Sequence, residues 1–215
     1  SLFGNIDYFL SENHKLAFGL RWENWDSKYN DSNQESFNPS DNMNGGKISL
    51  IKNNDNSNIY FSIARGYKQG GFNLGLDATD NSIKNSLIYD PEFLTNYEIG
   101  LSSNNNDSIL NYSAVFFFSK REDQQVLISR QVDPTDPNTF SYLTQNAAEG
   151  ENYGIEVSSE YFVRGNLNLF FNFGLLKTKI KNWESRIDLE NRAQAHAPER
   201  TYSFGTNLDI NNNLY

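Results

Sequence analysis

The feature that most constrains the fold of this chain is a two-residue alternation of apolar and polar side chains. Residues 94–101 show it clearly: Thr95, Tyr97, Ile99 and Leu101 fall on one side, and Asn96, Glu98 and Gly100 fall on the other. Successive side chains of a β-strand point to opposite faces, whereas an amphipathic helix repeats every 3.6 residues. The sequence therefore predicts an all-β, antiparallel fold.

The alternation recurs along the whole chain and predicts about ten strands. They are expected at residues 2–10, 15–23, 46–50, 59–68, 94–101, 110–119, 152–161, 167–176 and 202–208, with a further strand beginning at 213–215. The connections alternate between short turns and long loops. The long loops are expected at residues 27–44, 69–92, 128–147 and 180–199.

This ordering of the connections favours one class of β protein. Soluble sandwiches and barrels have no reason to keep every second connection long, whereas outer-membrane barrels have short periplasmic turns and long extracellular loops. Each strand also offers one apolar row for lipid and one row of Asn, Ser, Gly and Glu for water or a plug. We predict an antiparallel up-and-down transmembrane β-barrel, with a soluble all-β binding module as the alternative.

Composition excludes several classes of function. The chain has 27 Asp and Glu against 18 Lys and Arg, a formal net charge of -9, so it would repel nucleic acid. It has no cysteine for disulfides, thiolate nucleophiles or metal ligation. Its only histidines, His14 and His196, lie in a turn and a loop without a metal-spaced partner. We therefore predict no enzyme activity, no cofactor and no metal site.

The two ends of the sequence suggest a piece of a longer protein. Residues 1–4 lack the charged and apolar regions of a signal peptide and start inside an alternating pattern. Residues 213–215 look like the start of a strand. We expect residues 1–215 to form one partial barrel domain.

Several motifs stand out along the chain. The clearest is Arg65-Gly66-Tyr67-Lys68-Gln69-Gly70-Gly71-Phe72-Asn73, where an alternating strand runs into a Gly-Gly turn. The others are residues 91–101, 114–117 with 123–126, 151–156, and Ala197-Pro198. Together they resemble the barrel of TonB-dependent outer-membrane receptors, and they occur in that family's order over most of the chain.

The resemblance implies an active transporter of the bacterial outer membrane. Such a receptor has a 22-stranded barrel around an N-terminal plug and is energised by the TonB complex. This chain would supply about ten strands, with the plug domain and the remaining strands absent. A ferric siderophore is the expected cargo. Carbohydrate, haem or cobalamin uptake and a passive porin or adhesin barrel are the alternatives.

The resemblance and the loop composition together suggest ligand-binding residues. Arg65 and Lys68 would bind an anionic ligand or lipopolysaccharide phosphate, although isolated cations at a strand end often only reach solvent. The remaining candidates lie in the long loops: Phe72, Asn73, Tyr142 and Trp183. The loop sequences show no strong basic basin for an anionic iron chelate.

Two further sets of residues have expected positions in a barrel. Glu98, Glu156 and Glu160 fall on inward faces, where they would meet the plug or hydrate the lumen. Four aromatic residues are expected in the girdle at the membrane interface, with a ligand-stacking cluster as the alternative: Trp22, Trp25, Tyr67 and Tyr97. Outer-membrane lipid and lipopolysaccharide would then be direct partners.

Overall fold

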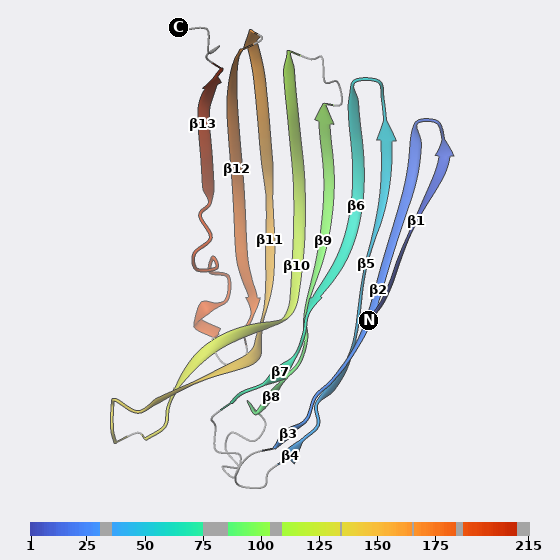
Figure 1. Ribbon diagram of the computed structural model, residues 1–215. Helices are drawn as coiled ribbons and strands as arrows, with labels where there is room; N and C mark the ends of the chain where they lie inside the picture. Colours follow the sequence, from blue (N-terminus) through green and yellow to red (C-terminus); the bar gives the residue numbers. More distant parts are fainter. Residues whose placement is uncertain are drawn as a thin grey trace, which may run out of the picture.

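The computed structural model describes residues 1–30, 36–74, 86–103, 109–133, 135–164, 166–183 and 187–209. Nine strands of these residues lie side by side in one curved layer (Figure 1). In spatial order they are β1 (Leu2–Ser11), β2 (His14–Asp26), β5 (Ser40–Asn53), β6 (Ser57–Lys68), β9 (Glu92–Ser103), β10 (Leu110–Gln131), β11 (Phe140–Arg164), β12 (Leu167–Asn182) and β13 (Arg200–Leu208). Every neighbouring pair is antiparallel. The predicted all-β, up-and-down fold is confirmed, as an open arc edged by β1 and β13.

The cross-strand register keeps the two faces of this layer chemically distinct. One row of directly paired residues contains Phe61, Ile99, Phe116, Ile155 and Leu175. The adjacent row, on the opposite face, contains Ser62, Glu98, Phe117, Gly154 and Leu176. Phe116 is 55% exposed and Ile99 is 51% exposed, because no second layer covers the apolar face. We call this apolar face outward and the other inward.

Short and long connections lie at opposite ends of the sheet, as predicted (Figure 1). Two long connections contain small hairpins, β3 (Tyr29–Asn30) with β4 (Ser36–Phe37) and β7 (Gly71–Phe72) with β8 (Ile88–Tyr89). The connection after β12 contains a short 3-10 helix, Ile187–Leu189. The strand expected at 213–215 lies outside the described residues.

The loop expected at residues 128–147 is the main difference from the sequence prediction. Pairing of β10 with β11 continues through Ile128↔Leu143 to Gln131↔Phe140, so only the turn between these two strands is a loop. The register shifts between Arg121 and Gln125, and Asp123 there has a positive φ of 53°. Such a bulge bends a strand. Beyond it the β10–β11 hairpin leaves the nine-stranded sheet, which we call the wall, and continues to Gln131↔Phe140 as a long arm (Figure 1). The residues with turn character at the tip of the arm led to the prediction of a loop for the paired segments on either side.

The buried apolar residues lie towards the long connections rather than within the wall. Among the described residues they are Met43, Leu87, Leu143, Ala148 and Ile180. Leu87 is the last residue of the β7–β8 connection, directly before β8, and Leu143 lies on the arm. A single sheet has no interior of its own, so this small core belongs to the connections.

Side-chain amides join the β7–β8 connection to the arm. Asn73 Nδ2 donates to the carbonyls of Ser86 (2.6 Å) and Thr144 (2.8 Å), while Asn73 Oδ1 accepts from the Thr144 N–H (2.7 Å). Asn146 mirrors this arrangement: its Oδ1 accepts from the Asp90 N–H (2.6 Å), and its Nδ2 donates to the carbonyls of Asp90 (2.7 Å) and Asp123 (2.8 Å). We call these two asparagines the amide latch. Each amide uses both donors and its acceptor.

Glycines on the inward face make room for aromatic rings on the neighbouring strand. Three directly paired residues repeat this arrangement: Tyr60 with Gly100, Phe117 with Gly154, and Phe170 with Gly205. A Cβ at each of these glycines would lie within 3.0 Å of the ring. The wall is therefore packed laterally, strand against strand.

The part of the chain that the structure describes contains no helix with the length and apolar character that a bilayer crossing requires.

The first prediction concerns this lateral packing. Gly100→Val should lower the free energy of unfolding of the complete protein by about 1–3 kcal/mol, since the new side chain overlaps the Tyr60 ring. Denaturant unfolding in detergent micelles measures the change. Gly66→Val is the control, because nothing lies within 4 Å of a Cβ at Gly66. Equal costs for both variants would contradict the packing argument.

The second prediction concerns the amide latch. Asn73→Ala leaves the Thr144 N–H without its acceptor and should cost about 1–3 kcal/mol of local stability. Hydrogen–deuterium exchange of peptides containing Thr144 should then accelerate about tenfold or more. Asn138→Ala, at the exposed tip of the arm, should leave that exchange unchanged. Unaltered exchange in Asn73→Ala would show that the latch does not hold the arm.

Candidate functional site

The wall divides into two strand pairs on the side of the long connections. Pairing of β5 with β6 ends at Gly46↔Arg65, but β2 and β5 remain paired to Asp26↔Ser40. Likewise β6 and β9 remain paired to Lys68↔Glu92. Beyond Gly46 the β2–β5 pair therefore separates from the β6–β9 pair. We call this separation the fork.

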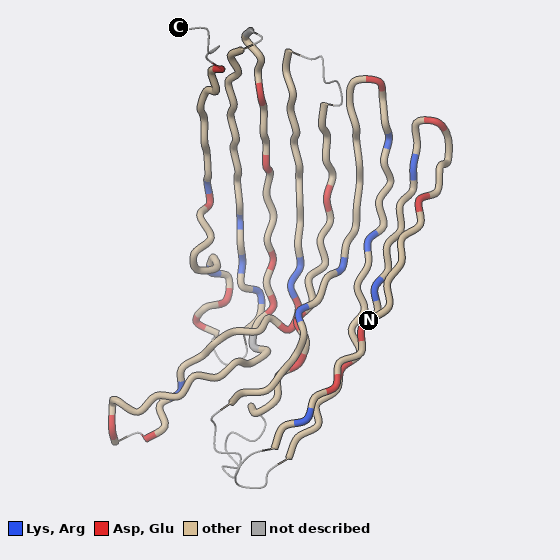
Figure 2. Tube along the Cα trace, in the orientation of Figure 1, with Lys and Arg blue, Asp and Glu red and all other residues tan. Residues whose placement is uncertain are grey.

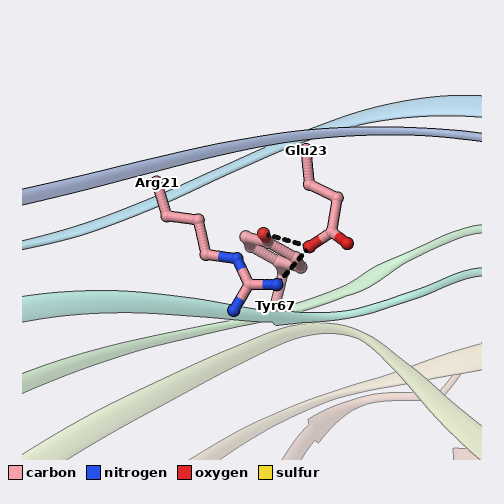
Figure 3. Close-up of polar contacts among 3 residues, drawn as sticks. All are labelled: Arg21, Glu23 and Tyr67. Carbon is pink, nitrogen blue, oxygen red and sulfur yellow. Dashed lines mark hydrogen bonds and ion pairs between the residues drawn. The ribbon is translucent and has the colours of Figure 1, made fainter. Parts of the chain in front are cut away.

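A three-residue polar cluster spans the fork (Figure 3). Tyr67 Oη, on β6, donates to Glu23 Oε2 on β2 at 2.8 Å. Arg21 Nη2 contacts the same carboxylate oxygen at 2.7 Å, and its guanidinium lies 5.9 Å from the centroid of the Tyr67 ring. Figure 3 shows Arg21 and Glu23 pointing from β2 towards Tyr67. This cluster joins the two strand pairs beyond the last β5–β6 pairing, towards the long connections.

A recess of about 740 Å³ lies beside this cluster. Most of its lining comes from inward-facing positions of β1, β2 and β5: Phe3, Asn5, Gly19, Arg21, Glu23, Met43, Gly45 and Lys47, with Gly66 and Tyr67 from β6 and Arg65 at its edge. We call it the fork recess. Its lining holds two inward cations, Arg21 and Lys47, and one carboxylate, Glu23, in a chain whose net charge is -9. Arg65 also borders the recess, but its position in the register is outward.

A second recess, of about 900 Å³, lies on the outward face at the same level. Its lining is mostly apolar and includes Leu2, Gly4, Phe18, Leu20, Trp22, Ile48 and Ile63. The wall between the two recesses is thin, because it contains Gly19, Gly45 and Gly46, which line both recesses. Arg21, Lys47 and Arg65 line both recesses, although Arg21 and Lys47 occupy inward positions in the register and Arg65 an outward one. The two recesses differ mainly in their other lining residues, which are more polar inside and apolar outside.

The predicted ligand residues fall into separate places. Arg65 lies outward, with its guanidinium 4.4 Å from the Phe93 ring centroid, and Lys68 ends β6 opposite Glu92. Asn73 belongs to the amide latch, with its amide fully used. Their role in ligand binding stays a prediction.

The remaining candidates lie on the connections. Phe72 packs near Tyr29, with ring centroids 5.2 Å apart, and Tyr29 stacks on Phe37 at 5.7 Å, so β7 contacts the β3–β4 hairpin. Tyr142 is 65% exposed on the arm. Trp183 follows β12, and its backbone N–H donates to Glu190 Oε1 at 3.5 Å. At the tip of the arm, hydrogen bonds from the hydroxyl and N–H of Thr135 hold the pKa of Asp133 below its usual value.

The three predicted lumen carboxylates are on the inward face. Glu98 accepts hydrogen bonds from Asn96 Nδ2 (2.7 Å) and Tyr60 Oη (3.3 Å). Glu160 accepts a hydrogen bond from Asn168 Nδ2. Glu156 is exposed and lines a smaller recess of about 360 Å³ with Ser113, Asn172 and Ser203. None of these contacts identifies a plug partner.

The predicted girdle residues differ in the face they occupy. Tyr97 is outward, 6.1 Å from Phe118 between ring centroids, and Trp22 lines the outward recess. Trp25 lies on the opposite face of β2 from Trp22, because the two are an odd number of residues apart. Tyr67 joins the fork cluster instead of lying free on the outward face.

Cations border the outward apolar face on the side of the long connections. Tyr97, Phe118 and Tyr153 are paired in one outward row. The next outward row, two residues further along each strand towards the long connections, contains Arg65, Thr95, Lys120, Glu151 and Lys179. Lys177 and Arg200 lie on the same face of β12 and β13. On β10, β12 and β13, Lys and Arg gather on the half nearer the long connections (Figure 2).

Sequence analysis missed the fork recess because its cations belong to different strands. Arg21 and Lys47 are separated by the 27–44 connection, and each appears in its strand as an isolated inward polar residue. The signal that brings them together is the register, in which Arg21 pairs with Gly45 and Gly19 pairs with Lys47. The sheet thereby assembles a small basic site that the loops alone did not show.

Comparison with known proteins assigns this wall to a family. The family model described as "TonB dependent receptor-like, beta-barrel" matches residues 1–215. A curated relative, the probable TonB-dependent siderophore receptor PiuA of Acinetobacter baumannii, is 27% identical over 147 residues, which are 65% of this chain and 19% of the relative.

Solved structures share the fold. The ferric yersiniabactin uptake receptor FyuA from Yersinia pestis superposes with a TM-score of 0.72 at 18% identity, over 97% of this chain and 30% of that one. The copper transporter OprC superposes with a TM-score of 0.69 at 17% identity, over 97% of this chain and 33% of that one. This chain thus spans a third or less of the proteins that it matches.

Barrels of this family are bacterial outer-membrane proteins, so the predicted localisation is confirmed. Its members are transport receptors and not enzymes. The chain belongs to the TonB-dependent receptor-like β-barrel family and forms part of the barrel wall of an outer-membrane receptor.

Proposed function

We propose that the protein containing this chain takes up a ferric siderophore actively across the outer membrane. Residues 1–215 form a partial barrel domain of that receptor. The observation that carries the proposal is the match of the whole chain to the family's barrel, together with a relative named as a siderophore receptor. The uptake receptor FyuA, which shares the fold, is named for a ferric chelate as well.

Energy for this transport comes from the TonB complex, through a plug domain inside the completed barrel. The inward face supports this arrangement, because it carries polar and charged groups along its length. Glu98, Glu156 and Glu160 are the residues that we assign to the plug-facing surface.

Copper uptake is a second candidate, since the copper transporter OprC superposes on almost the whole chain. In the described ranges, no group of three or more His, Cys, Asp or Glu side chains is placed to hold a metal ion. This favours a chelate over a bare ion as the cargo that meets this part of the wall.

The outward face positions the barrel in the membrane. From Leu110 to Phe118, β10 presents apolar or small outward residues over about 26 Å along the strand. At the usual tilt of barrel strands this corresponds to about 20 Å of height, most of a barrel's apolar band of about 25 Å. Trp22 and Tyr97 mark its interfacial end, next to the cations Arg65, Lys120 and Lys179. These cations are suited to lipid and lipopolysaccharide phosphates in the outer leaflet.

The third prediction concerns this apolar band. Phe116→Arg should destabilise the complete barrel by about 2–4 kcal/mol, because it places a charge in the hydrocarbon region. Reversible unfolding in lipid vesicles measures the cost. Glu156→Arg is the matched control, since its position lies at the same depth on the inward face. A negligible cost for Phe116→Arg would show that the outward face does not meet lipid.

The fourth prediction concerns the cargo. Deleting the complete gene should abolish growth on at least one ferric chelate under iron limitation, and restoring the gene should restore growth only in cells with an active TonB complex. A panel of ferric siderophores, haem and cobalamin, with copper-limited growth alongside, separates the candidates. Growth that does not depend on TonB would indicate a passive pore. A requirement for the gene only under copper limitation would favour copper uptake.

A further inference from the structure

We infer that the fork recess is an inner-wall subsite for an anionic group of the transported chelate. The inference rests on the proposed function, because it assigns part of the cargo to this wall. A carboxylate-bearing chelate fits best, because the recess is positively charged, has room for a small-molecule group and presents donors from β2 and β5.

The charge of the recess is positive and only partly neutralised. Arg21 contacts Glu23 through one guanidinium nitrogen, at 2.7 Å, and its side chain remains 54% exposed. Lys47 is exposed and forms no hydrogen bond or ion pair with the residues that the structure describes. Free donors on both cations therefore face a recess with one carboxylate, and charge-assisted hydrogen bonds to carboxylates are about twice as strong as neutral ones.

The fork cluster fixes the position of these donors. Tyr67 and Arg21 share the Oε2 atom of Glu23, so the hydroxyl holds the carboxylate from β6 while the guanidinium holds it from β2. The arginine is thereby oriented across the fork instead of extending freely from the wall (Figure 3). An oriented guanidinium loses less freedom when a ligand binds.

The floor of the recess is glycine. Gly66 lines the recess, and nothing lies within 4 Å of a Cβ at that position. Packing of the protein therefore does not require glycine there, but a side chain would project into the space. Glycine within a strand often marks a place where a ligand approaches the backbone closely. The volume of about 740 Å³ suits a small-molecule site.

The first arm of the test needs no knowledge of the cargo. Because this chain has no cysteine, Gly66→Cys in the complete receptor introduces a thiol on the floor of the recess. The thiol should react faster with an anionic sulfonate thiosulfonate than with a cationic trimethylammonium thiosulfonate, relative to a free thiol in solution. Adding Lys47→Gln should lower that ratio about fivefold, the order of magnitude expected when a unit charge is removed from the lining of the same recess.

Gly4→Cys is the matched control. Gly4 also has nothing within 4 Å of a Cβ, but it occupies an outward position opposite Leu20 and lines the outward recess, which is mostly apolar although Arg21, Lys47 and Arg65 belong to its lining. Its thiol should show a clearly weaker preference for the anionic reagent than the thiol at Gly66→Cys. If the thiol at Gly66→Cys prefers the cationic reagent, or if Lys47→Gln leaves its ratio unchanged, the recess does not attract anions and the inference is overturned.

The second arm uses the ferric chelate that supports growth. Gly66→Leu and Lys47→Gln should each weaken its binding to the purified receptor by about threefold or more, while Gly4→Leu should bind as the wild type does. Normal uptake with unchanged binding in Gly66→Leu would overturn the subsite and leave the proposed function standing. Absence of uptake for every chelate, with the charge preference intact, would instead overturn the proposed function.

Discussion

The hydrogen-bond register between neighbouring strands is the constraint on which the rest of this structure depends. A spanning wall must satisfy its backbone groups internally, because lipid offers no partners. Each described strand of the sheet is therefore paired along most of its length, and the pairing fixes which side chains share a face. Directly paired residues lie on the same face, so Phe116 faces outward with its partner Ile155. The next pair, Val115 and Glu156, faces inward.

The fork and the arm arise where this pairing is relaxed. On the membrane side of Gly46 the wall is continuous, and beyond it β5 and β6 separate and leave room for the fork recess. At Asp123 a bulge bends β10, and the arm continues as a paired hairpin outside the wall. Both features lie where the pairing of the wall ends or becomes irregular, so backbone pairing no longer dictates the geometry there.

The sequence was sufficient for the fold class and for the faces of the strands, because both follow from local alternation. It was insufficient for the extent of β10 and β11, since Asp and Pro residues near the tip of the arm masked the pairing of Ile128 with Leu143. It also missed the fork recess, whose cations Arg21 and Lys47 come together only through non-local register. Alternation is a local pattern, so it could assign Trp22 to the outward face. It could not identify the partner of Tyr67, because Glu23, which accepts its hydrogen bond, lies 44 residues away in the sequence.

The amide latch has a consequence for how receptors of this kind diversify. Within the described residues, the side-chain amides of Asn73 and Asn146 bond to backbone atoms of Ser86, Asp90, Asp123 and Thr144. Any residue except proline at those positions offers the same N–H and carbonyl groups. The side chains at these four positions can thus change without loss of the hydrogen bonds, while the two asparagines keep the connections joined.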